Sequence, residues 1–151
     1  MYNEHVIYMQ KAINEAKIAY EKNEVPVGAI IVFKDQVIAK AHNQIKTLKD
    51  PTAHAEIIAI TQASSYLKNE RLIECDLYVT IEPCSMCIGA MILARIKTLF
   101  FGAFDLKTGA CGSIINLTKP GLFNHNINVV SGILANESKD IIQKFFLGKR
   151  K

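Results

Sequence analysis

The sequence predicts a single α/β domain in which helices cover both faces of a mixed β-sheet. Segments with apolar residues at helical steps alternate with β-rich runs along the chain. A strand–helix–strand succession favours a right-handed crossover between parallel strands, and a short link between two earlier runs favours a hairpin. The 151 residues, half of them apolar, suffice for one well-buried core and are too few for two ordinary domains.

The first elements are a helix and a hairpin. Apolar side chains at steps of three and four predict one face of an amphipathic helix, at Val6, Met9, Ile13, Ala16 and Tyr20. Two β-rich runs joined by KDQ follow, VGAIIVF at residues 27–33 and VIAKAHN at residues 37–43. The chain is therefore expected to begin with a helix and two antiparallel strands.

Helices and strands alternate in the central part of the chain. Asp50 can cap, and Pro51 can open, a helix whose body is TAHAEIIAITQASSYL. DLYVTI, residues 76–81, is the third strand, and EPCSMCIGAMILAR follows as a helix with Pro83 at or near its first turn. KTLFFGA, residues 97–103, is the fourth strand, parallel to the third.

The last third of the chain contains a loop, a weak strand and a helix. The loop FDLKTGACGS is rich in glycine, and a fifth strand is predicted near INVVSG, residues 127–132. The segment ESKDIIQKFFLGKRK predicts a closing helix. The expected fold is thus a five-stranded mixed sheet.

Charge and hydropathy narrow the class of protein. Eighteen basic and fourteen acidic residues give a formal charge of +4, which permits an anionic partner without demanding one. Runs of 18 or more apolar residues are missing, and charges interrupt the N-terminal segment where a signal peptide would be apolar. We therefore expect a cytoplasmic protein with no membrane partner and no disulfide framework. Its cysteines are then free thiols, metal ligands or a redox pair: Cys75, Cys84, Cys87 and Cys111.

Cys84 and Cys87 lie three positions apart at the start of a predicted helix, so both thiols face one side of its first turn. The partial positive charge of a helix N-terminus lowers the pKa of a thiol and favours the thiolate, which is the form that binds zinc. Taken alone, the pair is equally typical of a zinc site and of a thioredoxin-type redox site.

His54 and Glu56 favour zinc over redox chemistry. Two positions apart on a helix, their side chains point about 200° apart, but both can reach an ion just beyond the helix N-terminus. His54, Cys84 and Cys87 then make three ligands, as in catalytic zinc sites, which keep the fourth position for water. Glu56 can carry protons as a general acid and base. A structural site stays open as an alternative, with a fourth ligand from Cys75, Cys111, His42 or His125.

The pattern His-x-Glu followed by Pro-Cys-x-x-Cys is the signature of zinc deaminases, and it stands here at residues 54–56 and 83–87. Around it, essentially the whole chain resembles the bacterial tRNA-specific adenosine deaminases of the cytidine deaminase-like superfamily. The segments that carry the resemblance are EVPVGAI, DPTAHAEI, LYVTIEPCSMCIGAM and FGAFDLKTGACGS. It implies a three-layer α/β/α fold and one zinc-dependent deaminase domain over residues 1–151.

The resemblance also implies an activity: hydrolysis of the amidine C–N bond of the adenosine at the wobble position of a tRNA anticodon, giving inosine and ammonia. An arginine tRNA with the anticodon ACG is the substrate that it favours. In this chemistry one zinc ion per subunit makes hydroxide from water, and the hydroxide attacks C6 of the purine. Glu56, by its place in the motif, would move protons to the ring nitrogen and the leaving amine. The implied partners are the tRNA anticodon arm and a second copy of the chain, in a homodimer.

Several substrate contacts follow from the same resemblance. Asn43 matches an asparagine that hydrogen-bonds the flipped nucleotide, and Val27 lies in a segment that matches the pocket wall. Asp105 matches an aspartate that contacts a ribose hydroxyl, which would favour RNA because only RNA has the 2′-OH. Lys107 and Thr108, in the same loop, are expected at the RNA backbone.

A second group of expected contacts lies toward the C-terminus. His125, Phe146 and Arg150 resemble the anticodon-loop surface of the family, where aromatic rings beside cations suit splayed bases and phosphates. At least one of Phe145 and Phe146 is expected in the core. Phe104 departs from the family pattern, in which a basic residue often stands.

Two alternative functions stay open. A free-base or nucleoside deaminase acting on guanine, cytosine or cytidine would keep the zinc site and Glu56 but would have no use for Asp105 or His125. A non-catalytic RNA-binding module with structural zinc would need a fourth protein ligand, and its Glu56 would be dispensable. Dependence of activity on tRNA separates the first alternative, and the effect of Glu56→Gln separates the second.

Overall fold

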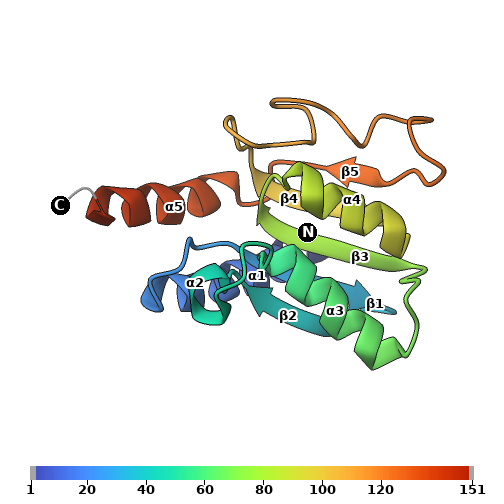
Figure 1. Ribbon diagram of the computed structural model, residues 1–151, viewed down its shortest axis with the longest axis horizontal. Helices are drawn as coiled ribbons and strands as arrows, with labels where there is room; N and C mark the ends of the chain where they lie inside the picture. Colours follow the sequence, from blue (N-terminus) through green and yellow to red (C-terminus); the bar gives the residue numbers. More distant parts are fainter. Residues whose placement is uncertain (1–2, 150–151) are drawn as a thin grey trace.

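A computed structural model of the chain describes residues 3–149. Within that range the chain forms a five-stranded sheet of order β2-β1-β3-β4-β5 with helices on both faces (Figure 1), which confirms the predicted fold class. The elements are α1 (Glu4–Glu21), β1 (Gly28–Phe33), β2 (Gln36–His42), α2 (Ile45–Leu48), α3 (Ala55–Leu67), β3 (Cys75–Ile81), α4 (Ser85–Ala94), β4 (Thr98–Ala103), β5 (Asn128–Val130) and α5 (Ala135–Lys149). No helix of the described part is both long and apolar enough to cross a membrane.

The sheet combines an antiparallel half with a parallel half. β1 pairs antiparallel with both β2 and β3, whereas β4 pairs parallel with both β3 and β5. The hairpin turn places Lys34 and Asp35 at φ values of 50° and 61°, the left-handed conformation that tight hairpin turns require. α4 connects β3 to β4, so the predicted helical connection between these parallel strands is confirmed.

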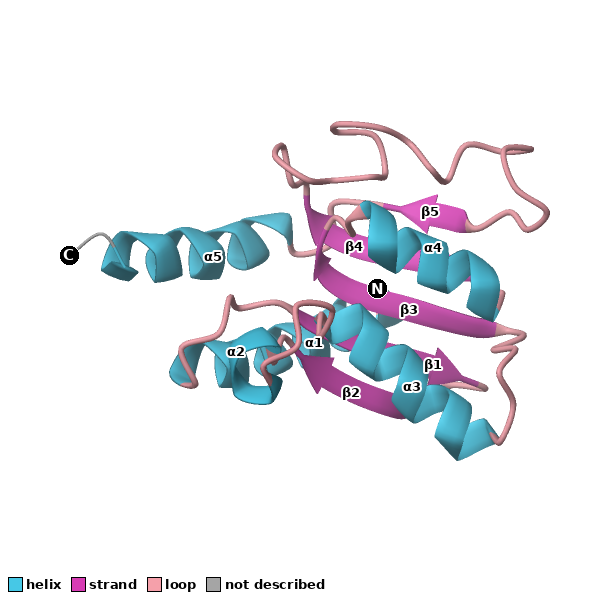
Figure 2. Cartoon of the chain, in the orientation of Figure 1, coloured by secondary structure: helices cyan, strands magenta, loops and turns pink. Residues whose placement is uncertain are grey.

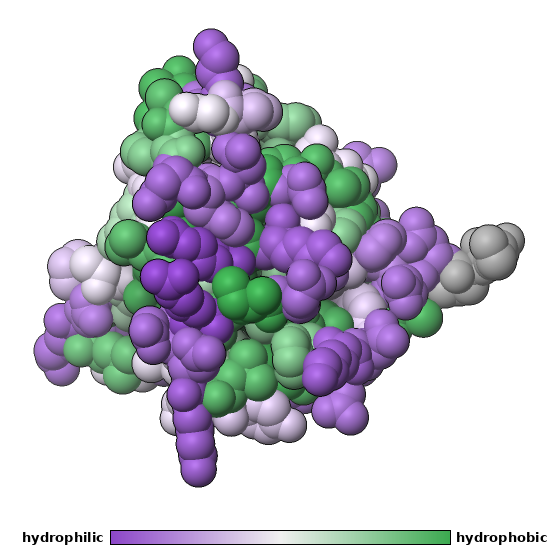
Figure 3. Space-filling model, turned by 90° about the vertical axis from the view of Figure 1, so that its right-hand side faces the viewer, coloured by the Kyte–Doolittle hydropathy of each residue, from purple (hydrophilic) through white to green (hydrophobic). Residues whose placement is uncertain are grey.

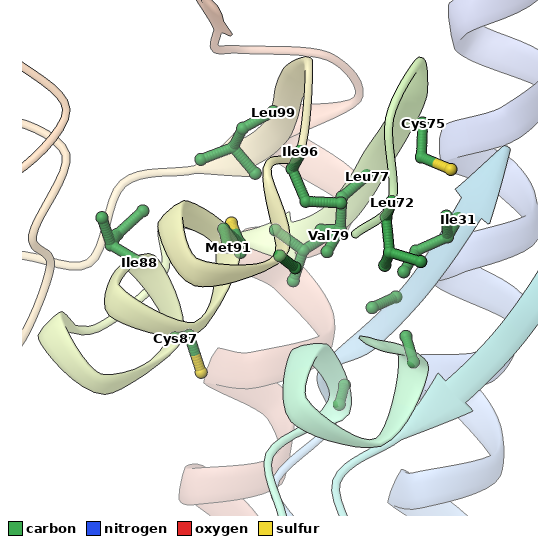
Figure 4. Packing of buried hydrophobic residues seen from close by; sticks show 14 of the residues in the cluster. Ile31, Leu72, Cys75, Leu77, Val79, Cys87, Ile88, Met91, Ile96 and Leu99 are labelled. Carbon is green, nitrogen blue, oxygen red and sulfur yellow. The ribbon is translucent and has the colours of Figure 1, made fainter. Parts of the chain in front are cut away.

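Alternate side chains of the strands pack into two cores, one on each face of the sheet. On one face, Ile30, Tyr78 and Phe100 pack against Met9 and Ile13 of α1. On the other face, α3 and α4 cover the sheet (Figure 2) and close the larger core. Figure 4 shows residues of α4 meeting those of β3 and the start of β4 in this core: Ile88, Met91, Leu77, Val79 and Leu99.

Two helix starts differ from the sequence prediction. The helix expected to open at Pro51 begins only after His54, because Asp50 accepts hydrogen bonds from the backbone N–H and the hydroxyl of Thr52 (2.9 and 2.7 Å) and closes a separate turn. α4 likewise begins only at Ser85, later than the predicted segment, with Pro83 near its first turn as expected. His54 and Cys84, the candidate metal ligands, therefore lie at the N-cap positions of these helices, closer to the helix N-terminus than predicted.

The short helix α2 was not predicted. Two backbone N–H groups of its only turn, on Lys46 and Thr47, donate to the carboxylate of Glu24 at 3.1 and 2.7 Å. Glu24 is only 2% exposed and lies 22 and 23 positions earlier in the chain. A cap supplied from so far away leaves no local signature in the sequence.

The segments that form the candidate site lie together at one end of the strands. β1 starts at this end of the sheet, and β2, β3 and β4 terminate there. α3 and α4 begin there, while α2 and α5 extend beyond it (Figure 1). The opposite end of the molecule is covered mostly by hydrophilic side chains, with apolar ones scattered among them (Figure 3).

Candidate active site

The starts of α3 and α4 bring three potential metal ligands together. His54 is the N-cap of α3, Cys84 is the N-cap of α4, and Cys87 lies in the first turn of α4. The Nδ1 atom of His54 lies 3.7 Å from the Sγ of Cys84 and 3.5 Å from that of Cys87. Tetrahedral zinc with Zn–S of about 2.3 Å and Zn–N of about 2.0–2.1 Å requires a separation of about 3.6 Å. The three side chains therefore fit a zinc ion.

The described residues offer this cluster no fourth protein ligand. Among residues 3–149, His54, Cys84 and Cys87 are the one group of three or more His, Cys, Asp or Glu side chains that lie close enough to hold a metal ion. Burial raises the pKa of Cys75 to about 11 and that of Cys111 to about 12, so both thiols stay protonated at neutral pH. A three-ligand set matches a catalytic zinc site, which keeps one position for water.

The two thiols of the cluster have opposite pKa shifts. A hydrogen bond from the Cys87 thiol, assisted by His54, lowers the pKa of Cys84 to about 4. Donating that bond to Cys84, together with burial, raises the pKa of Cys87. The hydrogen bond to Cys84 also raises the pKa of His54. The surroundings of Cys84 thus favour its thiolate, which is the form of cysteine that binds a metal ion.

Glu56 lies in the first turn of α3, next to the cluster but outside it. Its side chain is 3% exposed, and burial raises its pKa to about 7 against the opposing effects of its own backbone N–H and of His54. A carboxyl group with a pKa near neutrality can both accept and release a proton during a reaction. Its position suits proton transfer beside the metal position.

A cavity of about 970 Å³ opens beside the cluster, and His54, Cys84 and Glu56 line it. Its other walls come from the segment before β1, the residues after β2, the loop after β4 and one side of α5. Ligand pockets commonly measure about 300–1,000 Å³, so this one is at the upper end. The site can therefore receive more than a single base.

Comparison with known proteins assigns the family. A family model of MafB19-like deaminases matches residues 3–150. The tRNA-specific adenosine deaminase of Bacillus subtilis (strain 168) is 46% identical over 145 residues, covering 96% of this chain and 90% of that protein. The chain belongs to the tRNA-specific adenosine deaminase family.

Solved structures agree with that assignment. A structure from a study of A-to-I editing by tRNA:A34 deaminases at the wobble position of transfer RNA is 44% identical, with a TM-score of 0.86. The match covers 89% of this chain and 98% of that one. A guanine deaminase from Bacillus subtilis is 38% identical with a TM-score of 0.63, over 69% of this chain and 66% of that one. The enzyme class, a deaminase acting hydrolytically on an amidine C–N bond, is thus common to the family and its neighbours.

In this family member, Asn43 and Val27 both line the cavity, as expected for substrate-contacting residues. The Oδ1 of Asn43 accepts a hydrogen bond from the backbone N–H of Ala55 at 2.8 Å. That bond holds the first residue of α3, which lies between His54 and Glu56. Asn43 therefore fixes the helix start in addition to facing the cavity, and its contact with a nucleotide stays a prediction.

The loop after β4 places Asp105, Lys107 and Thr108 at the cavity. The Asp105 carboxylate accepts hydrogen bonds from the backbone N–H of Lys107 (3.0 Å) and from the N–H and hydroxyl of Thr108 (3.2 and 2.8 Å). It organises its own loop, and a carboxylate can accept further bonds, so a ribose hydroxyl remains a compatible partner. Phe104, also at the cavity, packs edge-to-face on Phe101.

The two phenylalanines of α5 have different surroundings. Phe146 lines the cavity with 45% of its surface exposed, whereas Phe145 is 7% exposed and packs against Tyr20. The expectation that at least one of them is in the core is therefore confirmed. Arg150, the remaining expected contact of this helix, lies outside the described residues.

His125 does not join the other expected contacts. Its Nε2–H donates to the backbone carbonyl of Ile96 at 2.7 Å, and Ile96 precedes β4, whereas the cavity lies where β4 ends. The strand alone spans about 20 Å at about 3.3 Å per residue. Within one subunit, His125 therefore lies away from the cavity and its ring anchors the loop before β5, and its expected contact with the anticodon loop stays a prediction.

The sequence interpretation missed several residues that line the cavity. Four of them come from α5, from the loop after β4 and from α2: Gln143 and Leu147, Leu106, and Ile45. The i, i+4 spacing of Gln143 and Leu147 on the same helix as Phe146 was a usable signal. Ile45 belongs to α2, for which the sequence has no local signal.

Proposed function

We propose that this chain deaminates the adenosine at the wobble position of a tRNA anticodon to inosine, with one zinc ion per subunit. The observation that carries the proposal is the His54, Cys84 and Cys87 cluster, with zinc-compatible separations, beside the buried Glu56 in an open cavity. The names of the relatives supply the substrate class, tRNA and adenosine. The resemblance further favours an arginine tRNA with the anticodon ACG, and such a substrate places the reaction in the cytoplasm.

The reaction adds water to C6 of the purine and releases ammonia, so protons must be moved between the water and the leaving amine. A zinc ion held by His54, Cys84 and Cys87 would supply an activated water as the nucleophile. Glu56 accepts the first proton of the attacking water and passes it to the ring nitrogen N1; it then accepts the second proton, from the hydroxyl group now on C6, and passes it to the amine nitrogen, which leaves as ammonia. Burial of Glu56 supports this role, because it brings the pKa close to the pH at which both transfers occur.

The size and lining of the cavity favour RNA over a free base. A cavity of about 970 Å³ exceeds what one purine needs, and Phe146 offers an exposed ring at its edge. Aromatic rings of this kind stack with unpaired bases. Lys107, in the loop that lines the cavity, adds a cation for the phosphate backbone.

The test is a comparison of substrates for the purified, zinc-loaded protein. The protein is incubated with an arginine tRNA with the anticodon ACG, and separately with adenosine, guanine, cytosine and cytidine. Each product is identified by mass spectrometry. Inosine at the wobble position, without turnover of the small molecules, is the expected result. Turnover of guanine alone would favour the guanine deaminase reading, which the partial likeness to a guanine deaminase supports.

We also propose that the chain acts as a homodimer. The outward side of α4 carries no charged side chain, and Leu93 on it is 78% exposed. Met86, Gly89 and Ala90 continue this apolar stripe along the helix. A contiguous apolar face of this kind is typical of a subunit interface. Sedimentation of the wild type as a dimer, and of Leu93→Lys as a monomer, is expected; a monomeric wild type would contradict the proposal.

A further inference from the structure

Glu82 is a buried carboxylate that the proposed reaction does not use. It follows β3 directly and is 1% exposed. Its two oxygens accept hydrogen bonds from the backbone N–H groups of Asp105 (3.0 Å), Cys111 (2.8 Å) and Ser113 (3.1 Å), and from the Ser113 hydroxyl. A buried carboxylate is stable only with such donors. These donors all belong to the loop of residues 104–113.

This loop forms one wall of the cavity. Asp105, whose N–H donates to Glu82, accepts in turn from the N–H groups of Lys107 and Thr108. A continuous set of hydrogen bonds therefore leads from the end of β3 to the backbone of Lys107, an exposed residue that lines the cavity. The placement of Lys107 depends on Glu82 through Asp105.

A second contact fastens the same loop to the segment that carries the metal ligands. Pro83, between Glu82 and Cys84, accepts a hydrogen bond through its carbonyl from the backbone N–H of Ala110 at 2.9 Å. A Cβ atom on Gly109 would overlap the Glu82 carboxylate. Because the carboxylate is held by its four donors, it cannot move aside without breaking them. The loop is thus fixed directly against the residues that precede Cys84.

We propose that Glu82 is a positioning residue for substrate binding, which holds the 104–113 loop at a set distance from the metal ligands. The inference rests on the proposed function, because its consequence is the alignment of loop-bound RNA with the reacting base. Glu82 acts through the loop and takes no part in the proton transfers. Its loss should therefore weaken RNA binding more than it slows the chemical step.

The test is steady-state kinetics of zinc-loaded Glu82→Gln on an anticodon-arm RNA. The carboxamide keeps the shape but turns an NH₂ group toward backbone N–H donors, so the loop must shift. We expect KM to rise about tenfold and kcat to change less than about twofold, with one zinc per chain retained. Glu70→Gln, at an exposed glutamate, is the matched control and should leave both constants unchanged.

Gly109→Ala disturbs the same contact from the loop side and should reproduce the rise in KM. It also keeps the test decisive if Glu82→Gln does not fold. A KM equal to that of the wild type in the soluble variants, with only the active fraction reduced, would show a merely structural role and overturn the proposal. Failure of the wild type to deaminate RNA would instead refute the proposed function, so the two failures are distinguishable.

Discussion

Replacement of Glu24 by glutamine tests whether a buried carboxylate holds α2 in place. Glu24 accepts hydrogen bonds from the N–H groups of Lys46 (3.1 Å) and Thr47 (2.7 Å) and from the Thr47 hydroxyl (2.8 Å). Hydrogen bonds to a charged group contribute about 1.5–3 kcal/mol each. Glutamine keeps one acceptor oxygen and turns its NH₂ group toward a donor, while water can reach the exposed Lys46 and Thr47. We expect Glu24→Gln to lower the free energy of unfolding by about 2 kcal/mol.

The assay is urea denaturation at neutral pH, with thermal unfolding as a second measure. A loss of about 2 kcal/mol should lower Tm by about 4–8 °C for a chain of this size. Glu21→Gln is the matched control, since Glu21 lies three positions earlier and is exposed. Equal losses for Glu21→Gln and Glu24→Gln would refute the reasoning.

The same variant carries a pH signature. Burial alone would raise the pKa of Glu24, but the hydrogen bonds from Thr47 and Lys46 outweigh burial and hold the pKa below its ordinary value of 4.5. The folded state thus binds the proton less tightly than the unfolded chain, so this stabilisation is complete above pH 4.5 and is lost as the pH falls through the folded pKa. The stability difference between wild type and Glu24→Gln should therefore shrink in acid; a constant difference would contradict the assignment.

Four further outcomes are expected. Glu56→Gln should reduce kcat by about 10²–10⁴-fold with zinc retained, by inosine assay and metal analysis; unchanged deamination would sink the mechanism. Chelation should abolish activity, and zinc should restore it at one ion per chain; activity without metal would argue against the site. Asp105→Ala should raise KM for RNA, and equal turnover would remove Asp105 from the RNA surface. Phe146→Ala should weaken RNA binding about tenfold or more, whereas Phe145→Ala should instead lower Tm.

The order of helices and strands along the chain was predicted well, because each strand and each long helix has its own hydrophobic period. The sheet, the hairpin turn and the connection through α4 between β3 and β4 were all expected. The first residue of each helix was predicted less accurately. Asp50 can cap a helix or close a turn with Thr52, and only tertiary packing decides between these local hydrogen bonds.

The residues in and around the candidate site likewise fall into those that the sequence predicted and those that it did not. His54, Glu56, Cys84 and Cys87 were found from their spacing, and the structure places them together, although their roles stay predictions. Glu24 and Glu82 were not found, since each fastens a backbone segment more than twenty positions away. A side chain that bonds to distant backbone N–H groups imposes no residue type on its partners, so no sequence pattern records it.

The positions of His54 and Cys84 as N-caps have a consequence for which ligand sets this fold accepts. Neither side chain makes the hydrogen bond usual for that position, so the positive ends of two helix dipoles converge on the metal position. A bare dication would be repelled by both. Two thiolates would balance the formal charge of a zinc ion and present the helices with an electroneutral cluster, whereas an all-histidine set would leave the full double charge there. The geometry of the helix starts therefore favours a sulfur-rich set of ligands.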